Sequence, residues 1–123
     1  MPTGRHRNVP TMTLRTLGHK SKEFRYSGTM DDGFVIHQTG YPRVDRCFLD
    51  EALRHFARQS VYGGFSEDNP TKNGFGEWVR DESSRLNSMK LTPRHGSFMA
   101  AILCKYFGVT RSLDGNAVVL RFP

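Results

Sequence analysis

Apolar positions along the chain change their spacing several times, and each change predicts an element. Between residues 24 and 36, the aromatic residues Phe24 and Tyr26 alternate with polar ones, and an apolar run resumes at Phe34 after an Asp-Gly pair at residues 32–33. Glycine accepts the positive φ angle that tight hairpin turns require. The pattern therefore predicts a β-hairpin in this part of the chain.

Helical spacing follows in two segments, residues 45–60 and residues 75–87. The first segment repeats apolar residues every three or four positions and opens with Asp45, a residue type that favours the start of a helix. The stretch 61–74 between them contains four Gly or Pro residues and predicts a loop. Its glycines and lysine precede a helix, but their spacing is not that of a phosphate-binding loop, so nucleotide binding is not predicted.

The C-terminal part of the chain predicts a well-delimited helix followed by a hairpin. Thr92 and Pro93 suit the start of the helix, and Gly108 suits its end. Residues 109–122 then form two β-prone runs joined through an Asp-Gly pair at residues 114–115. A capped helix followed directly by a hairpin is typical of a DNA-reading helix and its wing, but also of an ordinary α+β core.

Together these elements predict an α+β fold with an N-terminal β-hairpin, three helices and a C-terminal β-hairpin. Their order is also that of a winged helix, in which the third helix enters the major groove and the hairpin lies along the DNA backbone. Residues 1–22 contain two prolines, two glycines and no apolar periodicity. We expect them to form an extended, flexible basic arm, and residues 23–123 to form a single compact domain.

Charge is segregated along the 123 residues, whose formal net charge is +6. Residues 1–22 carry a net +5, residues 23–88 a net −3 and residues 89–123 a net +4. Clustered positive charge favours a polyanion as partner, so we expect the basic arm and the winged-helix-like C-terminal unit to contact the backbone of duplex DNA, in preference to RNA. The predicted nucleic-acid-binding residues are Arg5, Arg7, Arg15, Lys20, Lys22, Lys90, Arg94, Lys105, Arg111 and Arg121.

The side chains of the predicted third helix are not those that recognise the edges of bases in DNA. One face is apolar, and the other carries small residues, among them Ser97, Ala101 and Cys104. Arg, Lys, Asn and Gln are the side chains that match base edges, and this face lacks them. Contact with the phosphate backbone is therefore favoured over sequence-specific readout, and the small face indicates either core packing or an interface.

Two other functions remain open at this stage. The protein could be an interaction module, for instance an inhibitor docking on a nucleic-acid enzyme, or a homodimer, through the face of Ser97, Ala101 and Cys104. It could also be an RNA- or ribosome-associated component whose arm threads between RNA segments. Aromatic residues next to Lys22 and Arg25 on the first hairpin could stack on single-stranded bases. One buried face of a sheet would look the same and is favoured.

Catalysis is not predicted, and neither is a cofactor or a metal. The five histidines and two cysteines show no ligand spacing typical of zinc, and no nucleophile or phosphate-loop motif occurs. We expect Cys47 and Cys104 to be reduced, buried thiols. Neither a membrane-spanning run nor an apolar signal segment is evident, so a cytoplasmic location is expected.

Overall fold

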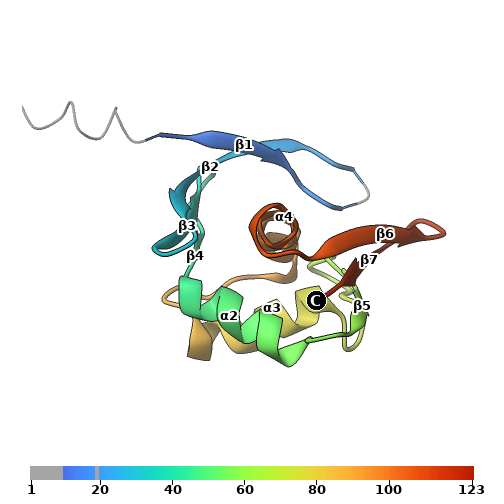
Figure 1. The fold of residues 1–123 in the computed structure, drawn as a ribbon. Helices are drawn as coiled ribbons and strands as arrows, with labels where there is room; N and C mark the ends of the chain where they lie inside the picture. Colours follow the sequence, from blue (N-terminus) through green and yellow to red (C-terminus); the bar gives the residue numbers. More distant parts are fainter. Residues whose placement is uncertain (1–9, 19) are drawn as a thin grey trace, which may run out of the picture.

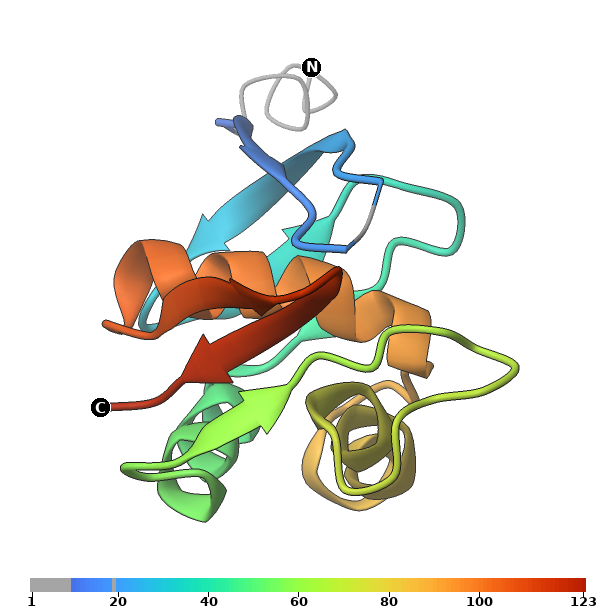
Figure 2. The same cartoon turned by 90° about the vertical axis from the view of Figure 1, so that its right-hand side faces the viewer.

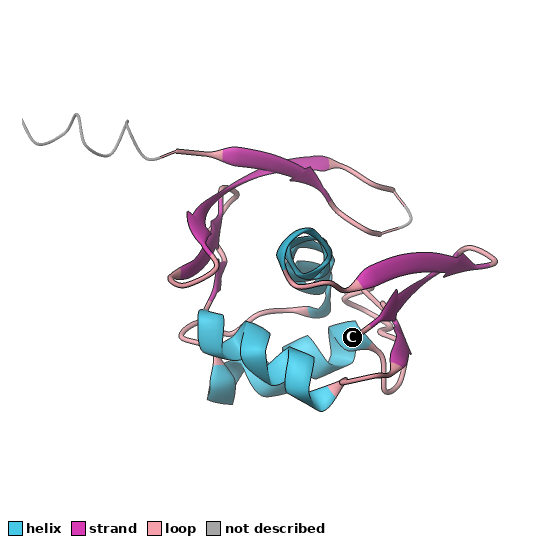
Figure 3. Ribbon diagram, in the orientation of Figure 1, coloured by secondary structure: helices cyan, strands magenta, loops and turns pink. Residues whose placement is uncertain are grey.

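The computed structural model describes residues 10–18 and 20–123, which form two antiparallel sheets and three α-helices (Figure 3). The α+β class predicted from the sequence is confirmed. The elements are β1 (Met12–Arg15), β2 (Glu23–Thr29), β3 (Gly33–Ile36), β4 (Arg43–Val44), α2 (Arg46–His55), β5 (Ser60–Tyr62), α3 (Phe75–Leu86), the 3-10 turn η1 (Pro93–His95), α4 (Gly96–Tyr106), β6 (Thr110–Asp114) and β7 (Ala117–Arg121).

The first sheet, in the order β1-β2-β3-β4, arches over helix α4 (Figure 1). Its register places Leu14 opposite Phe24 and Tyr26 opposite Ile36, so that apolar side chains share the face toward α4. The predicted hairpin is confirmed as β2 and β3. Phe24, Tyr26 and Phe34 are 3%, 1% and 0% exposed, so these aromatic rings belong to the core and cannot stack on bases.

Strand β1 shows that part of the predicted N-terminal arm belongs to the first sheet. Residues 12–15 pair with β2, and the backbone N–H of Thr16 donates to the carbonyl of Lys22 at 2.9 Å. The predicted arm therefore includes one strand of a hairpin, and it packs on the core through Met12, Leu14 and Leu17. This strand was not predicted from the sequence, because only two of its side chains, Met12 and Leu14, face inward. Two residues are too few to establish a period of two. Residues 1–9 lie outside the described part.

Helices α2 and α3 lie on the opposite side of α4 from the first sheet (Figure 1). Phe48 of α2 stacks on Trp78 of α3, with ring centroids 4.9 Å apart. A second sheet, in the order β5-β7-β6, completes the enclosure. Strand β5 lies where the sequence predicted only loop, because three residues with one buried side chain, Val61, carry no detectable alternation. The C-terminal hairpin was predicted correctly.

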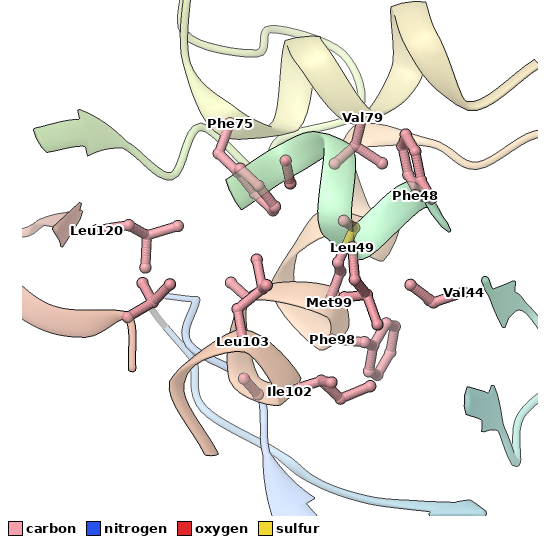
Figure 4. Close-up of a cluster of buried hydrophobic side chains, with 14 of the residues drawn as sticks. Val44, Phe48, Leu49, Phe75, Val79, Phe98, Met99, Ile102, Leu103 and Leu120 are labelled. Atoms are coloured by element: carbon pink, nitrogen blue, oxygen red, sulfur yellow. The ribbon is translucent and has the colours of Figure 1, made fainter. Parts of the chain in front are cut away.

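Helix α4 occupies the centre of the fold. Every residue from Gly96 to Leu103 is buried, on the apolar face and on the small-residue face alike. Figure 4 shows Met99, Ile102 and Leu103 among side chains from α2, α3 and the sheets. The chain itself covers the helix from Gly96 to Leu103, so these residues have no surface to offer to a major groove. Ser97 and Ala101, proposed as part of an interface, are 7% and 4% exposed.

Two local predictions also change. Asp45 occupies the N-cap position of α2 without a side-chain cap bond; its carboxylate instead accepts hydrogen bonds from Arg43 and from the backbone and hydroxyl of Ser88. This contact ties the start of α2 to the exit of α3. Cys47 is exposed rather than buried, while Cys104 is half-buried, and both are free thiols. Among the helices in the described ranges, none has the length and apolar character needed to cross a membrane.

Candidate nucleic-acid interface

The basic residues predicted to bind nucleic acid lie on several elements. Arg5 and Arg7 fall outside the described residues. The other eight are all exposed and are distributed as follows. Arg15 lies on β1, Lys20 and Lys22 on the β1–β2 connection, Lys90 before η1, Arg94 in η1, Lys105 in the last turn of α4, Arg111 on β6 and Arg121 on β7.

Ion pairing divides the positive side chains into two groups. Five of the seven arginines between residues 23 and 88 contact a carboxylate, namely Arg43, Arg46, Arg54, Arg80 and Arg85, whereas Arg25 and Arg58 contact none in the described part of the chain. Within the described residues, none of the eight predicted basic residues forms such a pair. Exposed charges without a protein partner remain available to an anionic ligand. Among the described residues, ion pairing is therefore concentrated in the acid-rich central part of the chain, while the basic residues near its ends form no ion pairs.

Three of the predicted residues meet in one hollow, which we call the basic cleft. Its volume is about 290 Å³, and it lies at the N-terminal end of α4. Lys20, Lys22 and Arg94 line it from two elements that are far apart in sequence. The remaining lining residues are Thr16, Gly18, Gln38, Phe65, Ser97 and Phe98. Lys90, Lys105, Arg111 and Arg121 are not among them.

Local hydrogen bonds shape the β1–β2 side of the basic cleft. The guanidinium of Arg15 donates to the hydroxyl and carbonyl oxygens of Ser21 at 3.2 and 3.0 Å. The backbone N–H of Lys22 donates to the hydroxyl of Thr16 at 3.0 Å. These bonds join the two ends of the β1–β2 connection on either side of the residues between them. Arg15 therefore has a structural role in addition to its charge.

The Arg94 side of the cleft is set by a capping box. The N–H of Thr92 donates to Nδ1 of His95 at 3.1 Å, and the N–H of His95 donates to the hydroxyl of Thr92 at 3.4 Å. An Nδ1 that accepts a hydrogen bond places the proton of the neutral ring on Nε2. Burial lowers the pKa of His95; the charge of Glu67 opposes this shift, and the charge of Arg94 adds to it.

The capping box makes stability depend on pH. The pKa of His95 is lower in the folded state than its ordinary value of about 6.5, so the unfolded chain binds the proton first. The free energy of unfolding should therefore fall as the pH drops below about 6.5. Urea denaturation at pH 7.5 and pH 5.5 measures this loss. The variant His95→Asn should lose less on acidification, because it lacks the imidazole whose pKa burial lowers. An equal loss in both proteins would contradict the assignment to His95.

Other reactive groups form no evident catalytic arrangement. In the described ranges, no three His, Cys, Asp or Glu side chains come together as a metal site would require. Burial raises the pKa of the Cys104 thiol, and the nearby charge of Arg111 only partly opposes this. A raised pKa disfavours the reactive thiolate. The hydroxyl of Tyr26 lies 2.6 Å from that of Tyr106, and burial together with this contact raises its pKa.

Sequence reasoning missed the uncharged part of the cleft. Phe65 and Gln38 lie in loops without periodicity, and their positions depend on tertiary contacts. A weak signal was present for Phe65, since an aromatic residue directly after two glycines in a long loop is an unusual arrangement. Comparisons with protein-family models, with curated proteins and with solved structures found no match to this chain.

Proposed function

We propose that this protein is a non-enzymatic nucleic-acid-binding protein that contacts the phosphate backbone, of DNA in preference to RNA. The observation that carries the proposal is the set of eight exposed basic residues without ion pairs, three of which line one cleft. Lysine and arginine that neutralise phosphates release counterions, which supplies affinity without base contacts. The two unbridged thiols are consistent with a cytoplasmic location, which is part of the proposal.

The order of the C-terminal elements supports a winged-helix-like unit. Helix α2, strand β5, helices α3 and α4, and the β6–β7 hairpin follow one another, and the hairpin carries Arg111 and Arg121. In this proposal the hairpin contributes backbone contacts, which position a nucleic acid without reading its sequence. Since α4 is covered, recognition of base edges in the major groove is not part of the proposed function.

The salt dependence of binding tests the proposal. Fluorescence anisotropy with duplex DNA, single-stranded DNA and RNA, at several salt concentrations, gives the slope of log K against log salt. Replacing Lys20, Lys22 and Arg94 together by glutamine should reduce the magnitude of that slope by roughly 2 to 3, at about 0.7–0.9 per phosphate contact. Removal of residues 1–22 is a poor test, because it also removes strand β1.

A matched control removes the same charge elsewhere. The triple variant Arg54→Gln, Arg80→Gln and Arg85→Gln also lowers the net charge by three, but its side chains are ion-paired on α2 and α3. Its slope should stay close to that of the wild type. Equal effects of the two triple variants would show that only net charge matters. No salt-sensitive binding of the wild type to any of the three ligands would overturn the proposal.

A further inference from the structure

Phe65 stands between two hollows on the same side of the molecule. It lines the basic cleft and also a second hollow of about 420 Å³, which we call the neutral hollow. Gly18 is likewise shared by the two, because the β1–β2 connection lies next to the tip of the β6–β7 hairpin (Figure 2). The ring is only partly buried. The exposed part of this aromatic ring, between two adjoining hollows, is available to a planar ligand.

Close packing holds the Phe65 ring in this place. A Cβ atom on Gly63 would lie 2.7 Å from two of the ring carbons, and one on Gly96 would lie 3.3 Å from another. The missing side chain at Gly63 therefore makes room for the ring. A ring held by backbone loses little conformational freedom when a ligand stacks on it.

The two hollows differ in chemistry. The basic cleft offers the charges of Lys20, Lys22 and Arg94, with the amide of Gln38 as a further donor. Glu67 lines an adjoining hollow that also contains Arg94, but the two side chains form no ion pair. The three cations of the basic cleft and the amide of Gln38 are hydrogen-bond donors that suit a phosphate.

Among the residues that the structure describes, none of those that line the neutral hollow is charged. It offers the ring of Tyr62, the hydroxyls of Ser66 and Thr71 and the amide of Asn116. The hydroxyl of Tyr62 donates to Asp114 at 2.6 Å, which orients the tyrosine. Aromatic surface with uncharged donors and acceptors suits the face and edge of a nucleobase.

We infer that the basic cleft and the neutral hollow together bind one nucleotide unit of a single-stranded nucleic acid. The phosphate lies toward Lys20, Lys22 and Arg94, and the base stacks on Phe65 within the neutral hollow. A base inside a duplex is stacked on its neighbours and cannot reach Phe65. The inference rests on the proposed function and specifies its ligand, namely a strand with at least one unpaired base.

The variant Phe65→Leu tests the stacking contact, since leucine keeps an apolar side chain but removes the aromatic face. Stacking contributes about 1–3 kcal/mol per base, so affinity for a single-stranded oligonucleotide should fall roughly 5- to 140-fold. Affinity for duplex DNA and the salt slope should not change. The variant Phe65→Tyr keeps the ring and should retain affinity for the single strand.

A second measurement uses the wild-type protein and does not depend on how the variant folds. An oligothymidylate containing one 2-aminopurine should lose fluorescence on binding, because stacking quenches this base. Unchanged fluorescence with bound oligonucleotide would overturn the inference, as would wild-type affinity in a folded Phe65→Leu protein. In both cases salt-sensitive binding would persist, so the proposed function would stand. If a free 5′-mononucleotide competed as well as the oligonucleotide, the inference that the ligand is a nucleic-acid strand would be overturned.

Discussion

Replacement of Phe34 by alanine is expected to lower the free energy of unfolding by roughly 3–5 kcal/mol, a large part of the stability of a domain of this size. Phe34 is 0% exposed and lies between the first sheet and α4. Its ring stacks on Tyr106 at a centroid distance of 5.1 Å and contacts Tyr26 edge-on at 5.8 Å. Removal of the ring leaves a cavity where the sheet covers the helix.

The comparison that makes this prediction specific uses two further variants. Phe34→Leu keeps most of the volume and should cost less than the alanine change. Leu113→Ala removes a side chain that is 59% exposed and should change stability by no more than about 0.5 kcal/mol. Urea denaturation followed by circular dichroism measures all three. A loss below about 1 kcal/mol for Phe34→Ala would mean that the first sheet does not stabilise α4.

Alanine at Gly76 should also destabilise the protein, by about 2 kcal/mol or more, although alanine is ordinarily the better helix former. A Cβ atom at this position in α3 would lie 2.1 Å from the carbonyl oxygen of Gly64. The N–H of Gly76 also donates to the carbonyl of Gly63 at 2.7 Å. Both contacts involve backbone atoms, which cannot move aside without displacing the loop.

Helix α3 itself supplies the control for this substitution. Ser84→Ala lies on the exposed side of the same helix and should be neutral or slightly stabilising. Thermal unfolding of the two variants gives the comparison directly. A Gly76→Ala protein as stable as the Ser84→Ala protein would show that helix propensity outweighs the close approach. Because the loop after Gly64 carries Phe65, the destabilised variant should also bind single strands less tightly.

Helix α4 shows why the site was only partly predictable. Its caps were correct, since Thr92 begins the helical segment and Gly108 follows it with a positive φ of 78°. Its two faces were also correct, and the small-residue face was recognised as a sign of either core or interface. The choice between them required a partner for that face. The folded chain itself covers most of that face, since Ser97, Ala100 and Ala101 are buried, and no local pattern of the sequence shows this.

The basic cleft was likewise only partly predictable from the sequence. Lys20, Lys22 and Arg94 were proposed from charge clustering, and the structure brings these three into one hollow. Lys90, Lys105, Arg111 and Arg121 were proposed on the same ground but lie outside it. Net charge along a chain predicts the sign of a ligand. It does not predict which charges meet, because this depends on contacts between segments more than seventy residues apart.

Local sequence patterns predicted the α+β class, the β2–β3 and β6–β7 hairpins, the presence of the three helices and the basic character of the chain ends, although the first helix ends at His55 rather than at residue 60. These follow from local physics, namely side-chain periodicity, capping residues, positive-φ turns and net charge. The tertiary structure was needed to show that β1 joins a sheet, that α4 is buried on all faces from Gly96 to Leu103 and that Phe65 lies beside unpaired cations. Those features depend on packing between distant segments, which no local pattern encodes.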